Sequence, residues 1–290
     1  MSETTLVELR SHIIKAFPDL EDSQYTLCTA GWDSVAVDVD NELIFKFPRD
    51  EEGHQALLTE ANLLTLIHPV VTLPVPLLTF FPGPPAFSRH RKIPGEHLTA
   101  EQYELLTEKD RQQLAADVAL FYAELHSLDK EKMKAAGAKP LPAWPSPDHI
   151  LQECLRALPP ELHTYAEKTI SARQELPPDT YGEIYGFFDG HGLNMAFDHT
   201  TNRLNGIYDF ADSGFGDLHQ EFLYTSWISA DLTERIVGAY ETLTNRTLDR
   251  QRIDLLTGFH RLGELAESAN DPKYGSVVLE SALNWAMRSL

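Results

Sequence analysis

Cysteine is scarce in this sequence, with Cys28 and Cys154 as the only two among 290 residues. Two cysteines so far apart form no disulfide framework and no cysteine-based zinc site, so we expect each to be a small buried apolar side chain. The sequence also lacks an apolar run long enough to cross a bilayer. Because the first residues are acidic and polar, without the basic and apolar segments of a secretory signal, we expect a cytoplasmic protein.

Basic residues are few as well: 24 Lys and Arg stand against 44 Asp and Glu, which gives a formal net charge of −20. A protein of this charge repels phosphate backbones and anionic lipid surfaces, which argues against nucleic acid and membranes as partners. The charge would attract a cationic ligand, although an acidic surface that keeps the chain soluble explains it more simply. The 42% hydrophobic fraction excludes a disordered chain and suffices for one large domain or two lobes.

Hydrophobic periodicity predicts an α+β region in the first third of the chain. Apolar residues recur at helical spacing in some segments and alternate with polar residues in others, with the turn residues Asp40-Asn41-Glu42 between two of the extended segments. A proline-rich stretch at residues 69–85 cannot be a long helix. The expected elements are helices at residues 6–18 and 51–67 and strands at residues 35–39, 43–47, 77–81 and 86–93.

After Pro94-Gly95 the pattern becomes mostly helical. Thr99 and Thr107 resemble helix N-caps, and a long apolar face then continues to His126. Residues 135–148 are rich in Pro, Gly and Ala and are expected to form a loop. A short pair of strands is expected at residues 194–197 and 206–208, before a final helical region that begins near residue 220.

Three short segments carry the residue types that phosphoryl transfer needs. Asp189 and Asn194 stand five residues apart in a loop that contains glycine, so their side chains can converge, and the strand pair brings Asp209 back beside them. Such a transfer needs one carboxylate that takes a proton from the acceptor hydroxyl, and oxygen ligands that hold Mg²⁺ against the phosphates. Lys46 on a strand and Glu60 on the next helix can supply the lysine that steadies the phosphates and the glutamate that holds it.

In combination these motifs resemble those of the aminoglycoside phosphotransferases, a family with the protein-kinase-like fold. The C-terminal part of the resemblance is Asp-x-His-x-x-Asn from Asp189, followed by Ile-x-Asp-Phe-x-Asp-x-Gly-x-Gly-Asp from Ile207. The matching N-terminal segments, in the same order, are Gly31-Trp32-Asp33-Ser34, the lysine strand at 44–49, Glu60 with its helix, and the hinge segments 73–76 and 92–98. The resemblance covers about residues 25–270, and the lysine strand and hinge look most like the 2''-aminoglycoside branch.

The resemblance implies a bilobal α+β fold, with a small, mostly antiparallel-sheet N-lobe at residues 1–92 and a larger, mostly helical C-lobe at residues 93–290. The N-lobe would bind ATP or GTP, and the C-lobe would carry catalysis and the substrate. The implied roles are Asp189 as catalytic base, Asn194 and Asp209 as Mg²⁺ ligands, and Ser34, Lys46, Glu60, Lys92 and Ile93 as nucleotide-binding residues, the purine meeting backbone groups of the last two.

The acceptor stays open. The resemblance implies an aminoglycoside-like, possibly cationic substrate, and hence an antibiotic-resistance enzyme. Relatives also phosphorylate homoserine, choline, methylthioribose, macrolides or hygromycin. Helical carboxylates are mostly solvated, so we expect only one or two acidic candidates to touch the substrate. The candidates are Asp212, Glu221, Asp231, Glu264 and Glu267.

One departure from the family keeps a second class of function in view. The family usually has His two residues before the catalytic Asp, where this sequence has Phe187. A nucleotide-binding relative without catalysis is therefore an alternative. His191 is expected to steady its loop rather than to react. We expect a monomer, and the short span after Asp209 leaves no room for the activation segment of a protein kinase.

Overall fold

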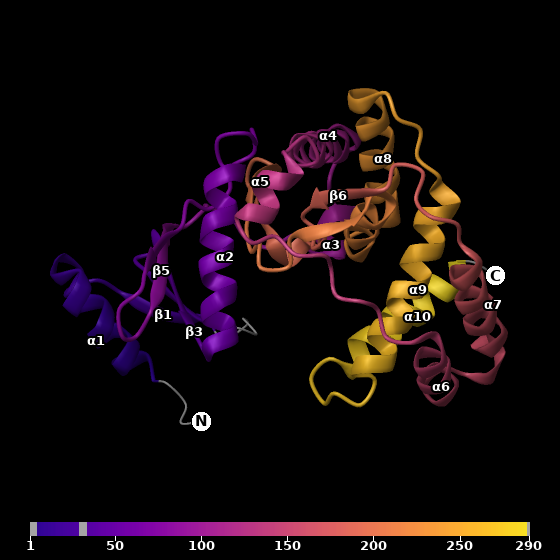
Figure 1. Cartoon of the computed structure of the whole chain (residues 1–290), viewed down its shortest axis with the longest axis horizontal. Coiled ribbons are helices and arrows are strands. Elements are labelled where there is room, and N and C mark those ends of the chain that lie inside the picture. Colours follow the sequence, from indigo (N-terminus) through magenta and orange to yellow (C-terminus); the bar gives the residue numbers. More distant parts are fainter. Residues whose placement is uncertain (1–4, 29–33, 289–290) are drawn as a thin grey trace.

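The computed structural model describes residues 5–28 and 34–288, with an N-terminal sheet at one end of its long axis and a group of helices at the other (Figure 1). Among those residues, no helix is both long and apolar enough to cross a membrane. The N-terminal elements are α1 (Leu6–Ala16), β1 (Tyr25–Cys28), β2 (Ser34–Val39), β3 (Leu43–Pro48), α2 (Glu51–Ile67), β4 (Thr79–Phe81) and β5 (Phe87–Arg91). The later helices are α3 (Ala100–Glu104), α4 (Glu108–Leu125), α5 (Lys130–Ala135), α6 (Pro147–Ala157), α7 (His163–Glu175), α8 (Ala230–Thr244), α9 (Arg250–Ser268) and α10 (Gly275–Arg288). The later strands are β6 (Glu183–Gly186), β7 (Met195–Asp198), β8 (Arg203–Ile207) and β9 (Gly214–Asp217), and short 3₁₀ helices lie at Pro18–Leu20, Pro160–Leu162, Gly192–Asn194 and Leu218–Trp227.

The N-terminal sheet is antiparallel throughout, with the strand order β1-β2-β3-β5-β4. Side chains alternate between its two faces. Val37 and Phe45 point to the outer face and share a core with Leu9 and Ile13 of α1. The opposite face carries Lys46 and meets α2. Helix α1 therefore closes the apolar face, and the polar face is left for the rest of the molecule.

Helix α2 is anchored in both lobes. Asp50 caps its first turn by accepting a hydrogen bond from the Gly53 N–H at 2.9 Å. Further along, Ala61, Leu64 and Ile67 belong to the large core that continues through α4 and the C-terminal strands. This burial fixes the helix that carries Glu60 against the C-terminal lobe as well as against the sheet.

Two short β-ladders organise the C-terminal lobe. Strand β6 pairs with β9, and β7 pairs with β8. The loop between β6 and β7 and the loop between β8 and β9 therefore leave the ladders side by side, and these are the loops that carry Asp189 and Asp209. Helices α6, α7, α9 and α10 enclose a separate core at the far end of the molecule (Figure 1).

The predicted α+β class is confirmed, as is much of the predicted element order. Helix α2 begins and ends at the predicted residues, and Asp40 and Asn41 form the predicted turn with positive φ angles of 57° each. The strand expected at 77–81 is shorter, and the pairing of β6 with β9 was not predicted. Cys154 is buried as expected, whereas Cys28 is only partly buried.

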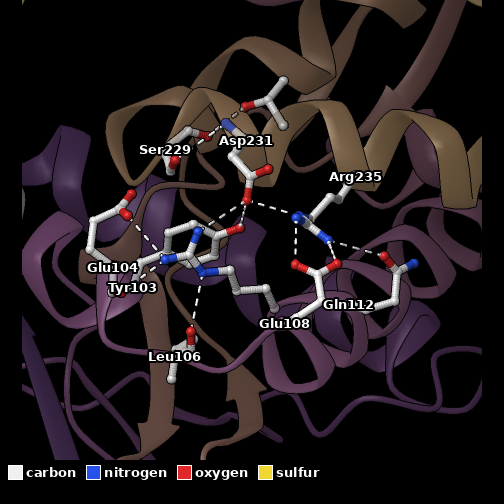
Figure 2. A network of polar contacts seen from close by, with 10 residues as sticks. Tyr103, Glu104, Leu106, Glu108, Gln112, Ser229, Asp231 and Arg235 are labelled. Atoms are coloured by element: carbon white, nitrogen blue, oxygen red, sulfur yellow. Dashed lines mark hydrogen bonds and ion pairs between the residues drawn. The ribbon is translucent and has the colours of Figure 1, made fainter.

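A network of charged side chains joins α3, α4 and α8 (Figure 2). Asp231, at the start of α8, accepts hydrogen bonds from Tyr103 Oη at 2.6 Å and from Arg235 Nε at 2.8 Å. Arg235 also donates to Glu108 of α4 at 2.5 Å. Because Tyr103 is fully buried, its hydroxyl depends on the Asp231 carboxylate. This placement argues for a structural role of Asp231 and against a substrate contact.

Replacing Asp231 by Ala is expected to lower the free energy of unfolding by about 1–2 kcal/mol, because the buried Tyr103 hydroxyl loses its partner. Denaturant unfolding measures this change. The matched control is Glu104→Ala, which removes an exposed partner of Arg111 and is expected to change stability by less than about 0.5 kcal/mol. Equal decreases in the free energy of unfolding in the two variants would show that the Tyr103–Asp231 contact stabilises the protein no more than an exposed ion pair does.

Candidate active site

Lys46 joins the two lobes at the candidate site. Its Nζ lies 3.2 and 3.3 Å from the two carboxylate oxygens of Glu60 and 3.1 Å from Asp209 Oδ1. Burial alone would lower the pKa of Lys46, but the two carboxylates outweigh it and raise the pKa above its usual value. The result is a charged ammonium group held at a fixed point between β3, α2 and the Asp209 loop.

The backbone at Asp209 is held in an uncommon conformation. Its φ angle is 67°, in the left-handed region that residues other than glycine rarely adopt. The next N–H, that of Phe210, donates to Glu60 Oε1 at 3.1 Å, so one carboxylate holds both the lysine and this loop. The Asp209 side chain is 47% exposed and can therefore meet a ligand as well as Lys46.

The predicted base, Asp189, is oriented by its own loop, residues 187–194. Asn194 Nδ2 donates to Asp189 Oδ2 at 2.6 Å and to the Asp189 carbonyl at 3.0 Å. His191 Nε2 lies 3.1 Å from Asp189 Oδ1. Burial would lower the pKa of His191, but the hydrogen bond and charge of Asp189 raise it. His191 thus steadies the carboxylate, which keeps 21% of its side chain exposed.

Asn194 and Asp209 have the donor types that Mg²⁺ prefers. The β7–β8 ladder brings them together, because the Tyr208 N–H donates to the Asn194 carbonyl at 3.1 Å. Across residues 5–28 and 34–288, no group of three or more His, Cys, Asp or Glu is arranged to hold a metal ion. The donor types of Asn194 and Asp209 match an ion that takes its other ligands from phosphate oxygens and water, as Mg²⁺ commonly does.

Glu221, a predicted substrate contact, instead holds the loop that carries Asp189. Its side chain is fully buried, and its two oxygens accept bonds from the backbone N–H groups of Phe187 and Phe188, both at 2.9 Å. Its Oε2 also lies 3.2 Å from His126 Nε2. Phe188 has a φ angle of 53°, so the carboxylate secures a strained backbone immediately before Asp189. The prediction for Glu221 is corrected accordingly: a buried carboxylate with both oxygens engaged does not face a substrate.

Phe187 stands where the family usually has His, and it supports the Asp189 loop by aromatic packing. Its ring is fully buried, 5.9 Å from the ring of Phe121 and 4.9 Å from that of Phe210, measured between centroids. The aromatic contact links α4, the Asp189 loop and the residue after Asp209. Gly190 permits the close packing, because a Cβ there would collide with the Tyr122 hydroxyl. The loss of the histidine therefore leaves the loop supported.

Lys92, one of the two predicted hinge residues, is held by contacts with the N-terminal sheet. The Lys92 N–H donates to the Glu42 carbonyl at 2.7 Å, and its Nζ contacts Asp38 Oδ2 and Asn41 Oδ1 at 2.5 Å each. The Lys92 N–H is therefore engaged in the sheet, and Ile93 follows it beyond the end of β5.

Of the segment predicted as the nucleotide loop, Ser34 is the described residue. Ser34 is the first residue of β2 and is half-buried, opposite Pro48 of β3. Gly31, Trp32 and Asp33, which were predicted for the same loop, lie outside the described residues.

Among the remaining acidic candidates, Glu264 on α9 lies close enough to Asp189 for the two charges to interact. Burial raises the pKa of Glu264 to about 7 against the opposing charges of Arg261 and His191, and the charge of Asp189 adds to the increase. Its Oε2 is buried and has no hydrogen-bond partner among the described side chains and backbone groups. The other two candidates, Asp212 and Glu267, are exposed.

This chain belongs to the phosphotransferase enzyme family, whose model matches residues 24–256. The predicted family and enzyme class are thereby confirmed. The family assignment agrees with the site, in which a partly buried lysine contacts one carboxylate and an asparagine contacts a second.

Solved structures show the same fold. The GDP complex of wild-type aminoglycoside 2'-phosphotransferase-IIIa has a TM-score of 0.82 at 20% identity, over 99% of this chain and 100% of that one. The gentamicin complex of APH(2")-IIa has a TM-score of 0.66 at 20% identity, over 100% and 98% of the two chains. Macrolide 2'-phosphotransferase MphH from Brachybacterium faecium has a TM-score of 0.66 at 17% identity, over 95% and 97%. At these identities the likeness establishes the fold.

Replacing Glu221 by Gln is expected to lower kcat by about tenfold to a hundredfold, because one backbone N–H loses its acceptor and the Asp189 loop relaxes by a fraction of an ångström. The KM for nucleotide is expected to stay within about twofold, since Glu221 faces no ligand. Steady-state kinetics and thermal unfolding give both readouts. Glu280→Gln, at an exposed position on α10, is the control. Unchanged kcat in Glu221→Gln would mean that the loop holds its geometry without this carboxylate.

Proposed function

We propose that this protein transfers the γ-phosphoryl group of ATP or GTP to a hydroxyl of an aminoglycoside-like substrate. The observation that carries the proposal is the set of contacts of Lys46 with Glu60 and Asp209, next to a loop in which Asn194 orients Asp189. Fold relatives support both ligand classes, because one is a complex with GDP and kanamycin and another a complex with ATP and streptomycin. In this proposal residues 1–92 bind the nucleotide, residues 93–290 carry catalysis and the acceptor, and the protein works as a cytoplasmic monomer.

Each residue of the site has a defined task in such a transfer. Asp189 accepts a hydrogen bond from the acceptor hydroxyl and takes its proton as that oxygen bonds the γ-phosphorus and the bond to the nucleoside diphosphate breaks. Lys46 steadies the phosphates. Asn194 and Asp209 would hold Mg²⁺, which supplies charge neutralisation on the phosphate oxygens. Catalysis in this arrangement consists mainly of positioning and of charge stabilisation.

The acidity of the site supports a cationic acceptor. Glu264 lies close enough to Asp189 for their charges to interact, and the whole chain carries a net charge of −20. An amino sugar with ammonium groups would pair with the Glu264 carboxylate, whose Oε2 has His260 Nε2 at 3.5 Å, while presenting a hydroxyl to Asp189. Assays of nucleotide consumption with aminoglycosides, macrolides, hygromycin, homoserine, choline and methylthioribose would identify the acceptor, and turnover with a neutral acceptor alone would refute the cationic class.

The structure removes the main reason for expecting a nucleotide-binding protein without catalysis. That expectation rested on Phe187, and the packing of this ring with Phe121 and Phe210 keeps the loop supported. Asp189 retains its contacts with Asn194 and His191. We therefore favour the enzyme over the binding protein.

Replacing Asp189 by Ala is expected to lower kcat by about 10²–10⁴-fold, because the acceptor hydroxyl loses its base. Nucleotide affinity is expected to stay within about threefold, since the phosphates are held by Lys46 and the Mg²⁺ ligands. Kinetics and calorimetric titration with nucleotide measure the two effects, with Glu280→Gln as the control. Turnover near the wild-type rate in Asp189→Ala would refute the assignment of the base.

The raised pKa of Glu264, about 7, predicts a pH dependence of acceptor recognition. Below this pKa the carboxyl group is neutral, so its attraction for an ammonium group is lost as the pH falls and gained as the pH rises. About a tenth of the group is ionised at pH 6 and about nine tenths at pH 8, so kcat/KM for an amino sugar should rise severalfold over this range. Glu264→Gln should flatten this rise, and exposed Glu267→Gln should keep it. An unchanged profile in Glu264→Gln would assign the titration to another group.

A further inference from the structure

A chain of hydrogen bonds between side chains leads from the Asp189 loop to α8. Glu221, which accepts two backbone N–H groups of that loop, lies 3.2 Å from His126 Nε2 on α4. His126 Nδ1 in turn lies 2.9 Å from the Tyr240 hydroxyl on α8. Arg246, two residues after the end of α8, donates from Nη1 to the same hydroxyl at 3.4 Å. The chain therefore connects the loop with the C-terminal half of α8.

The groups at the two ends of this chain fix the direction of each hydrogen bond in it. A carboxylate can only accept, so His126 Nε2 must carry the proton that Glu221 receives. A guanidinium can only donate, so the Tyr240 oxygen accepts from Arg246 and its own proton is directed to His126 Nδ1. Burial raises the pKa of Tyr240 to about 12, so the hydroxyl keeps that proton. The chain thus requires the tautomer of His126 with its proton on Nε2 and its lone pair on Nδ1.

Burial and packing hold the two rings of the chain in place. Tyr240 is fully buried and the side chain of His126 is 3% exposed, so water has little access to either partner. The His126 ring stacks on Tyr122, with 6.0 Å between the centroids, and the Tyr240 ring lies 5.1 Å from that of Phe222. Turning the imidazole over would set carbon atoms against Glu221 and Tyr240, and both hydrogen bonds would be lost. The Tyr240 hydroxyl therefore helps to determine how His126 meets the carboxylate.

We propose that Tyr240 is a positioning residue for the phosphoryl transfer. This inference rests on the proposed function. The hydroxyl fixes the tautomer and the orientation of His126, and through that ring it steadies the Glu221 carboxylate behind the Asp189 loop. Without the hydroxyl, His126 Nδ1 is a buried acceptor with no donor, and the ring shifts or turns to find one. The carboxylate moves with the ring, and a displacement of a fraction of an ångström at Asp189 slows a transfer that depends on alignment.

The first test is Tyr240→Phe, which removes the hydroxyl and keeps the aromatic ring. We expect kcat to fall by about threefold to tenfold and the KM for nucleotide to stay within about twofold, because no ligand-binding residue changes. The matched control is Tyr181→Phe. It removes a second tyrosine hydroxyl, which bonds the backbone of Thr247 and takes no part in the chain, so kcat is expected to stay within about twofold of wild type. Equal decreases in kcat in the two variants would overturn the proposal.

A double-mutant cycle separates positioning from a general loss of stability. In Glu221→Gln the path from Tyr240 to the loop is already weakened, so adding Tyr240→Phe is expected to change kcat by less than about twofold. Decreases that multiply in the double variant, as independent sites would give, count against an action through Glu221. Thermal unfolding of the three variants shows whether each one is folded under the assay conditions.

Nitrogen NMR of the histidine rings tests the geometry without turnover and without any variant. The wild-type protein is expected to carry the His126 proton on Nε2 and a lone pair on Nδ1. A proton on Nδ1 would overturn the proposal, even if Tyr240→Phe did not fold. Amide hydrogen exchange adds a local readout, because in Tyr240→Phe the N–H groups of Phe187 and Phe188 are expected to exchange at least about threefold faster than in Tyr181→Phe.

These readouts also separate the inference from the proposed function. If the tautomer and the exchange rates are as expected but no acceptor is phosphorylated, Tyr240 supports the loop and the proposed transfer fails. If acceptors are phosphorylated and Tyr240→Phe retains the wild-type kcat, the proposed function stands and the inference fails.

Discussion

The site depends on one partly buried cation, Lys46. Lys46 is held between Glu60 and Asp209, which come from the first lobe and the second, and a charge in so covered a position is tolerable only when it is paired. Glu60 can serve because α2 is packed into the main core, and Asp209 can serve because its backbone is held with a positive φ. Through this contact the sheet, helix α2 and the Asp209 loop share one geometry, and a displacement of any of them moves the Lys46 ammonium group.

Buried carboxylates also act as scaffolding around that point. Glu60 accepts the Phe210 N–H as well as Lys46, and Glu221 accepts the N–H groups of the two residues before Asp189. Both acids therefore secure loops whose backbones are strained, while the exposed fractions of Asp189 and Asp209 remain available for ligands. The buried glutamates, Glu60 and Glu221, hold backbone N–H groups, whereas the partly exposed Asp189 and Asp209 can contact a substrate and a metal ion.

The features that could be predicted from the sequence are those that local patterns determine. The features that were missed depend on contacts between distant segments. The bounds of α2 follow from an apolar stripe behind the cap at Asp50, and the pair Lys46–Glu60 was expected from a strand followed by a helix. The pairing of β6 with β9 was missed because four-residue strands leave little periodicity. The role of Glu221 was missed because its partners are backbone N–H groups, which have no sequence signature, and because fully buried glutamates are rare.

We expect residues from both lobes to meet around one nucleotide-bound metal ion. A crystal structure of the protein with Mg²⁺ and a non-hydrolysable triphosphate tests it most directly. We expect Mg²⁺ at about 2.0–2.1 Å from oxygens of both Asn194 and Asp209, with Lys46 Nζ in contact with the phosphates. A nucleotide bound elsewhere, or a metal ion that touches neither Asn194 nor Asp209, would contradict it.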